Sequence, residues 1–227
     1  AQLPLGIIGI ALGITLLTSL SKSNAIKDAN QFSKELIISF RIGLFFSIPA
    51  ALVFISFSDL LIKVLFERGE FGLQETMQTS HALIAYSIGV PAFIILKSCQ
   101  PAFLAEGNTK TPMYVGFILL ILNIVLSIGL MIYLKHAGIA LATSLASWIG
   151  SIIYISLLIK NGKITKPIFS FEEKDTNLFL IILYGFKITL ISCLMILCMK
   201  YIQHVLEIYD MNEVFVLVIL CMFGFIM

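Results

Sequence analysis

Long apolar runs, each about the length of a helix that crosses a bilayer, dominate this sequence. A transmembrane helix needs about 20 apolar residues to cross a hydrocarbon core about 30 Å thick. Backbone groups in lipid must be satisfied within a helix or a closed barrel, and these runs lack the alternation of barrel strands. We therefore predict an all-α, polytopic helical membrane bundle. Its six complete spans are predicted at roughly 3 to 20, 36 to 58, 80 to 104, 113 to 134, 137 to 159 and 178 to 203.

A seventh apolar run begins near Val214 and reaches Met227, where the sequence stops before the run is long enough to cross a bilayer. The sequence opens at Ala1 and shows no basic n-region followed by a short apolar segment and a cleavage site. We therefore expect the chain to be a piece of a longer protein, with a truncated seventh span.

Composition excludes several classes of function. Hydrophobic residues make up 59% of the chain and charged residues 12%, against about 25% charged residues in soluble domains, so a soluble enzyme is excluded. The net charge of +2 leaves no basic excess for a nucleic-acid partner. The four cysteines lie in apolar runs without metal spacing, and we expect them to be small buried hydrophobes. No catalytic motif occurs, so we predict no enzyme, no metal and no cofactor.

Charge in the loops predicts two unequal faces of the bundle. Loops that follow the odd-numbered runs carry eight lysines, and those that follow the even-numbered runs carry three basic residues. The positive-inside rule would place the eight-lysine face in the cytoplasm. The two groups are Lys22, Lys27, Lys34, Lys110, Lys160, Lys163, Lys166 and Lys174, and Lys63, Arg68 and Lys135.

Prolines interrupt two of the predicted spans. Pro49 lies in the second span, and Pro91 and Pro101 lie in the third, where each removes a backbone hydrogen bond and favours a kink. Kinked helices often line the cavities of transporters. The alternative is that membrane helices tolerate proline generally.

The ionisable residues inside the predicted spans are all positive: Arg41, Lys97, Lys187 and Lys200. Buried charge is costly in lipid and usually faces a cavity or a partner. Antiparallel alternation places the first three on one side of the membrane, roughly 9 to 14 Å deep at 1.5 Å per residue. No Asp or Glu lies in the middle of a span, which argues against a proton- or cation-coupled pump with its ion site here.

Positive charge without a carboxylate in a low-dielectric interior predicts an anionic ligand, and a phosphate or diphosphate fits. Arg41 can give bidentate contacts to phosphate oxygens, and Lys97 can give a point charge. The alternative is snorkelling, in which both side chains reach the lipid headgroups. Tyr86, Phe93, Lys97 and Gln100 fall within about 60° of one another on a helix, which is typical of a cavity lining. Spacing does not settle which way Arg41 points.

Four local strings resemble the lipid II flippase family (MurJ/MviN), in the order and spacing of that family. They are QLPLGIIGIALG at 2–13, LFERGEF at 65–71, PAFLAEGNTKTP at 101–112 and HAGIALATSLASW at 136–148. The resemblance covers about residues 1 to 160, and the remainder matches as hydrophobic spans. The family belongs to the multidrug/oligosaccharidyl-lipid/polysaccharide flippase superfamily.

The resemblance implies a transporter with fourteen spans in two lobes. Such proteins move lipid II, the undecaprenyl-diphosphate-linked peptidoglycan precursor, across the bacterial inner membrane by alternating access, and so serve cell-wall biogenesis and cell shape. Residues 1–160 would be spans 7 to 11 of the C-terminal lobe, 161–177 a polar loop, and 178–227 span 12 and part of span 13. The partners would be lipid II, membrane lipids and the missing N-terminal lobe, with no nucleic acid.

The resemblance also carries expectations for single residues. Arg41 falls where the family has a cavity-lining arginine in its eighth span, and Lys97 matches a lysine in the ninth. Ser39 and Phe40 stand where the family often has an acidic residue, so a local ion pair to Arg41 is not expected. The family topology places the loop 22–35 in the periplasm, which opposes the charge count.

Two alternatives stay open. A drug or organic-cation exporter of the same superfamily would need an acidic residue outside this segment. A non-transporting remnant or scaffold, the product of a split gene, would have no facing lobe with which to form a cavity.

Overall fold

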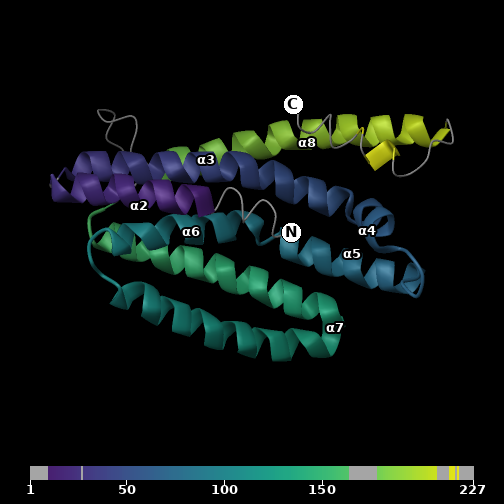
Figure 1. Cartoon of the computed structure of the whole chain (residues 1–227), viewed down its shortest axis with the longest axis horizontal. Coiled ribbons are helices and arrows are strands. Elements are labelled where there is room, and N and C mark those ends of the chain that lie inside the picture. The colour runs from purple at the N-terminus through teal and green to yellow at the C-terminus, as the bar shows by residue number, and fades with distance from the viewer. Residues whose placement is uncertain (1–9, 27, 164–177, 209–214, 218, 220–227) are drawn as a thin grey trace.

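The computed structural model describes residues 10–26, 28–163, 178–208, 215–217 and 219, which form a bundle of α-helices (Figure 1). No strand occurs among these described residues, and the predicted all-α class is confirmed. The helices are α2 (Ile10–Ala25), α3 (Ala29–Ser56), α4 (Ser58–Phe66), α5 (Leu73–Ser87), α6 (Val90–Leu104), α7 (Lys110–Lys160) and α8 (Leu178–Ile208).

Several of these helices are long and apolar enough to cross a membrane. By length and composition three described helices qualify, namely α3, α7 and the stretch Ile181–Leu206 of α8. The bent pair α5 and α6 raises the number to four if the pair counts as one span. The chain is therefore a multi-pass membrane protein.

The helix α7 is a hairpin of two legs. Its 51 residues are divided at Lys135, whose φ of 50° and ψ of −126° reverse the chain direction, and Figure 1 shows the two legs running back along each other. At Gly138 an added Cβ would collide with the carbonyl of Leu130. The two legs correspond to the predicted spans 113–134 and 137–159.

The predicted third span, 80 to 104, is wrong in its start and its continuity. The helix α5 begins at Leu73, where the carboxylate of Glu75 accepts a hydrogen bond from the Gly72 amide at 3.0 Å. A break at residues 88 and 89 then bends α6 away from α5 by 42°. Pro91 lies in the first turn of α6, where its missing N–H costs no helical hydrogen bond.

Two polar segments expected to be loops are partly helical. The helix α3 begins at Ala29, not at residue 36, because the Asp28 side chain caps it by accepting a hydrogen bond from the Gln31 amide at 2.9 Å. The segment after α3 forms the short helix α4. Charge alone does not end a helix, and the caps set the observed boundaries. Pro49 lies inside α3 without ending it.

Some expectations fall wholly or partly on residues that the structure leaves undescribed. Residues 1–9 of the first span, 164–177 of the loop, and most of the run that begins near Val214 lie outside the described ranges. The described helix of the first span, α2, continues five residues beyond the predicted end at residue 20.

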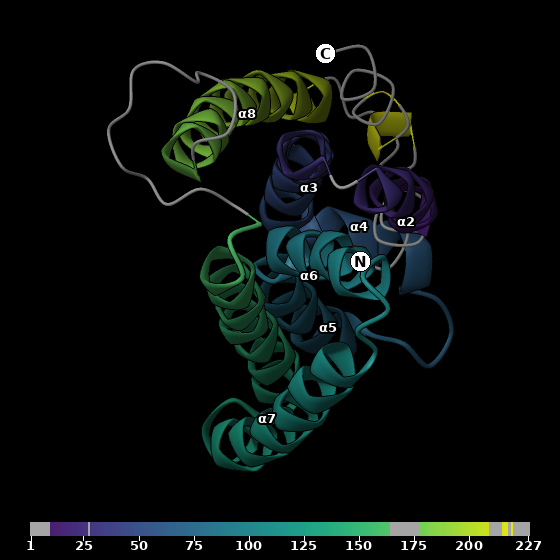
Figure 2. The same cartoon turned by 90° about the vertical axis from the view of Figure 1, so that its left-hand side faces the viewer.

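The helices stack in layers when the bundle is viewed from its end (Figure 2). There α8 covers α3, α3 and α2 lie on α6, and α6 lies on α7. The main core lies between α2, α3, α6 and both legs of α7, and Ile181 of α8 joins it. Its largest fully buried side chains include Phe32, Leu36, Phe103 and Tyr154.

The cysteines divide between the core and the surface. Cys99 is buried in the core, as expected. Cys193 and Cys198 are exposed, so the expectation of burial is wrong for these two. Both lie on α8, which among the described helices packs against α3.

Candidate functional site

Helices α3 and α6 are tied together by two buried serines. The Ser39 hydroxyl donates a hydrogen bond to the Ser98 hydroxyl, with the oxygens 3.2 Å apart. Arg41 follows Ser39 by two residues and Lys97 precedes Ser98 by one, on helices that run in opposite directions (Figure 1). The two cationic residues therefore lie at nearly the same level along the bundle.

Arg41 and Lys97 share a level but not a face. At 100° per residue, Arg41 lies about 200° around α3 from Ser39, and therefore points away from α6. Ile48, seven residues later on the same side of α3, lies 3.9 Å from the place where a Cβ on Gly185 of α8 would be. Arg41 thus faces the α8 side of α3. Lys97 is exposed on α6.

Arg41 lies at the border between the buried and exposed sides of α3. Its residue is half-buried, and its Nε atom is buried without a hydrogen-bond partner in the described part of the chain. Next to it around the helix lie exposed apolar side chains, Ile38, Ile42 and Phe45. A buried guanidinium nitrogen without a partner is costly, and an acceptor supplied from this open side would remove the cost.

The predicted aromatic stripe exists as one face of the bent helix pair. Tyr86 of α5 and Phe93 of α6 stack across the break, with ring centroids 5.7 Å apart and planes at 23°. Lys97 and Gln100 continue this face, and Tyr86, Phe93 and Gln100 are all half-buried. The stripe is the least buried side of α6. That it lines a cavity stays a prediction.

Lys187 does not share the level of Arg41. The Ile48 Cδ1 lies 3.9 Å from a Cβ placed on Gly185, and Phe57 packs in one cluster with Met199, so α3 and α8 run in the same direction. Ile48 lies seven residues beyond Arg41, which is about 10 Å along a helix. The expectation that all three cations lie at one depth is therefore wrong for Lys187. That expectation counted depth from the ends of the predicted spans and took those ends to lie at one level.

The break between α5 and α6 is held by the second leg of α7. The Ser144 hydroxyl donates to the Ala85 carbonyl at 2.6 Å, the Trp148 indole N–H to the Ile88 carbonyl at 3.1 Å, and the Ser151 hydroxyl to the Ala92 carbonyl at 3.0 Å. These bonds satisfy carbonyls on both sides of the break. Sequence reasoning missed this role, although Ser144 and Trp148 lie within the string at 136–148.

Glu35 is a second residue that sequence reasoning missed, because it was assigned to a loop. It lies in the second turn of α3 and is half-buried. Its Oε1 accepts hydrogen bonds from Ser23 at 3.1 Å and Gln31 at 3.0 Å, while its Oε2 is buried without a partner among the described residues. The capping signal at Asp28 could have placed it inside the helix.

Three lysine-rich loops meet at one end of the bundle, as their alternation predicts. Lys163 forms an ion pair with Glu106 and lies 4.9 Å from the centre of the Phe32 ring. The backbone carbonyl of Lys163 accepts a hydrogen bond from Ser33, and that of Ala105 accepts one from Asn24 at 3.2 Å. Which side of the membrane this end faces stays a prediction.

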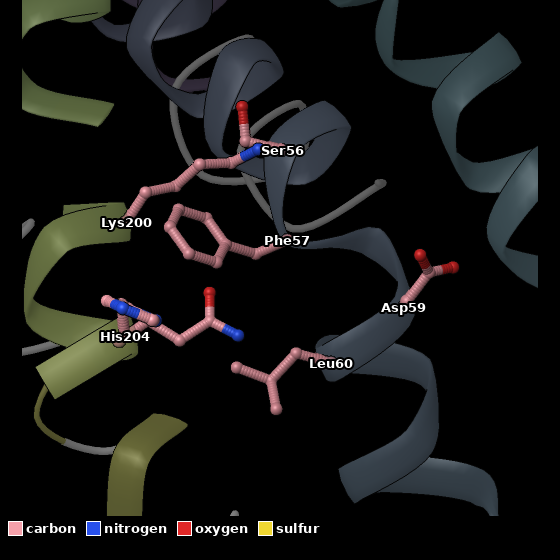
Figure 3. A pocket seen from close by; sticks show the side chains of 7 residues that line it. Ser56, Phe57, Asp59, Leu60, Lys200 and His204 are labelled. Carbon is pink, nitrogen blue, oxygen red and sulfur yellow. The ribbon is translucent and has the colours of Figure 1, made fainter. Parts of the chain in front are cut away.

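A polar pocket lies near the other end of the bundle, and Arg41 and Lys97 do not line it. Its volume is about 290 Å³, and it lies between the junction of α3 and α4 and the last part of α8 (Figure 3). In the described part of the chain no group of three or more His, Cys, Asp or Glu residues could hold a metal ion. The pocket is lined by Ser56, Phe57, Asp59, Leu60, Lys200, Gln203 and His204.

Comparison with known proteins gives one consistent result. The family model described as "Lipid II flippase MurJ" matches residues 1–219. The chain is 41% identical over 150 residues to the probable lipid II flippase MurJ of Rickettsia prowazekii, covering 65% of this chain and 29% of that protein. It is 31% identical over 225 residues to the protein of the same name from Buchnera aphidicola subsp. Acyrthosiphon pisum, covering 98% of this chain and 42% of that protein.

A solved structure agrees with these relatives. A lipid II flippase MurJ in an inward closed conformation superposes with a TM-score of 0.74 at 28% sequence identity, covering 99% of this chain and 42% of that one. The chain thus spans less than half the length of these relatives. Since the family model covers nearly the whole sequence and the fold agrees, the chain belongs to the lipid II flippase MurJ family.

Proposed function

We propose that this chain works as the C-terminal part of a flippase that moves lipid II across the bacterial inner membrane. Membership of the family supports this proposal, since the relatives are named for that activity. The observation that carries the proposal at the level of residues is Arg41. Its Nε is buried without an acceptor, beside an open apolar face of α3.

The chemistry of the substrate fits this arrangement. A diphosphate carries several acceptor oxygens, and a guanidinium can bind two of them at once. The exposed face of α3 is apolar, which suits a polyprenyl chain beside the headgroup. Arg41 would hold the diphosphate while a facing N-terminal lobe closes over it, and the hydrogen bond between Ser39 and Ser98 would hold its helix in place.

Lys97 has a second, separable role in this proposal. It projects from α6 at the level of Arg41 but on another face, so it does not share one bidentate site with Arg41 in this arrangement. It would attract the anionic headgroup along the stripe of Tyr86, Phe93 and Gln100. Its loss should slow transport without abolishing it, because a point charge outside the tight site contributes to approach more than to holding.

Complementation tests the proposal. The intact protein with Arg41→Ala should fail to rescue cells depleted of their own flippase, and Arg41→Lys should rescue partially, because lysine keeps the charge but loses the bidentate geometry. The matched control is Arg68→Ala, which removes the chain's other arginine, an exposed residue between α4 and α5. Membrane abundance, measured by immunoblotting, separates loss of transport from loss of protein.

The outcomes also decide between the alternatives. Full rescue by Arg41→Ala at normal abundance would remove the diphosphate assignment. Failure of the unaltered protein to flip lipid II in reconstituted vesicles, with transport of organic cations instead, would favour the exporter. A chain that transports neither class, even when joined to an N-terminal lobe, would be a scaffold.

A further inference from the structure

The polar pocket at the end of α3 has features that the flippase reaction does not use. It lies where α3's apolar stretch ends at Ser56 and close to Leu206, where the apolar stretch of α8 ends. This is the level at which a membrane helix leaves the hydrocarbon and meets the headgroups. The buried ring of Phe57 lines the pocket and also belongs to the small core cluster with Met199 and Val216.

Opposite charges flank this pocket. Lys200 and His204 are four residues apart on α8 and therefore share one face of that helix, while Asp59 lies in the first turn of α4. Figure 3 shows the Lys200 side chain reaching from α8 over the Phe57 ring towards Ser56, with Asp59 on the opposite side. None of the three charged or titratable side chains makes a hydrogen bond or an ion pair within the described part of the chain.

From this arrangement we infer that the pocket binds the zwitterionic headgroup of a membrane phospholipid that carries a phosphate and a primary ammonium. The phosphate would bind Lys200 and His204, and the ammonium would bind the carboxylate of Asp59. A ligand with both charges pairs with the basic side chains of α8 and with the carboxylate of Asp59. A simple anion would instead leave that carboxylate next to a like charge. Pockets that enclose whole drug-sized molecules measure about 300–1,000 Å³. The volume of this pocket, about 290 Å³, lies just below that range and therefore suits a lipid headgroup whose acyl chains stay outside.

The surface next to the pocket identifies a lipid as the source of this headgroup. Leu197 and Leu190 lie within about 80° of Lys200 around α8, and their side chains are 64% and 52% exposed. Acyl chains attached to a bound headgroup could lie along this apolar strip, whereas a soluble phosphoethanolamine compound would leave it bare. The inference does not rest on the proposed flippase activity, because Arg41 and Lys97 lie outside the pocket.

The ammonium also predicts a selectivity. Phosphatidylethanolamine has N–H donors for Asp59, phosphatidylcholine has none, and phosphatidylglycerol has no cation. We therefore expect the unaltered protein to retain phosphatidylethanolamine in preference to the other two. A lysine that merely snorkels would bind every phosphate and show no such preference.

Native mass spectrometry of the intact protein, equilibrated in detergent with an equimolar mixture of the three lipids, measures this selectivity. Lys200→Gln should lower the retained phosphatidylethanolamine by about three- to tenfold, the range for one charge-assisted contact. Lys200→Arg should restore it. Asp59→Asn should bring the ratio of phosphatidylethanolamine to phosphatidylglycerol close to one. The matched control Lys187→Gln removes an exposed lysine of the same helix outside the pocket, and should change nothing.

Three results would overturn the inference. Equal retention of all three lipids by the unaltered protein would show that the pocket does not discriminate between their headgroups. An equal loss with Lys187→Gln and Lys200→Gln would show non-specific attraction to lysine. Displacement of the lipid by millimolar glycerophosphoethanolamine would assign the pocket to a soluble ligand. Unchanged thermal unfolding of each variant confirms that a loss of binding is not a loss of folding.

Discussion

The hydroxyl oxygens of Ser39 and Ser98 lie 3.2 Å apart in the buried contact between α3 and α6. This bond joins the helix that carries Arg41 to the helix that carries Lys97, within two residues of each. A slide of one helix along the other would break the bond and separate the levels of the two cations. The serine pair therefore fixes the level of Arg41, which would hold the diphosphate, relative to that of Lys97, which would attract it from another face.

Replacing the two serines tests this relation. We expect Ser39→Ala and Ser98→Ala each to lower the free energy of unfolding. The double variant should lose less than the sum of the two single losses, because the same hydrogen bond is lost in each of the three variants. The coupling energy should be about 0.6 kcal/mol, the average for side-chain hydrogen bonds between membrane helices. Unfolding of the four proteins in detergent measures it. Strict additivity would show that the bond contributes nothing.

The fold class could be predicted from the sequence. The thickness of the bilayer sets the length of an apolar run that can cross it, and such runs are visible in the sequence. The turn at Lys135 was predicted to within two residues, since a charge between two apolar runs marks a crossing of the interface. The starts of α3 and α5 were not predicted. They depend on capping by Asp28 and Glu75, which lie in polar segments that charge alone assigns to loops.

The candidate site could be predicted only in part, for a physical reason. A cation in an apolar run is visible in the sequence, so Arg41 and Lys97 could be named as candidates, and their role in binding stays a prediction. The face that each occupies depends on which helices pack against its own, and this is a long-range property. The pocket at Asp59 and Lys200 was not predicted at all, because no periodicity links residues so far apart in the chain.

Gly89 should resist substitution by alanine. A Cβ at this position would lie 2.6 Å from the Ser144 Oγ and 2.8 Å from the Ser144 Cα, so the second leg of α7 would have to move. We expect Gly89→Ala to cost about 1–3 kcal/mol, as overpacking does. Gly116→Ala is the control, because nothing lies within 4 Å of its added Cβ. Unfolding that leaves both variants equally stable would contradict the close approach.

Ser144 should keep the break between α5 and α6 closed. Its bond to the Ala85 carbonyl is lost in Ser144→Ala, and we expect a cost of about 0.5–1.5 kcal/mol with faster amide exchange around residues 85–92. The control is Ser156→Ala, whose hydroxyl bonds only the Ile152 carbonyl within its own helix. Hydrogen exchange monitored by mass spectrometry separates the two. Equal exchange in both variants would show that the bond does not hold the break.

Lys135 should be replaceable by glycine with a gain in stability. Its φ of 50° and ψ of −126° lie in a region that glycine adopts readily, and an L-residue there costs about 1–3 kcal/mol. Its side chain is exposed, so packing does not offset this cost. We therefore expect Lys135→Gly to raise the midpoint of thermal unfolding and Lys135→Val to lower it.

The control for this change is Lys160→Gly, at the exposed helical end of the same hairpin, where glycine should destabilise by about 1 kcal/mol. Opposite signs at the two lysines would show that backbone conformation, not the loss of a lysine, sets the effect. If both variants were destabilised, the turn would have to hold Lys135 in an ordinary conformation. The two legs of α7 would then meet through a different geometry, and the close contact of Gly138 with Leu130 would no longer follow.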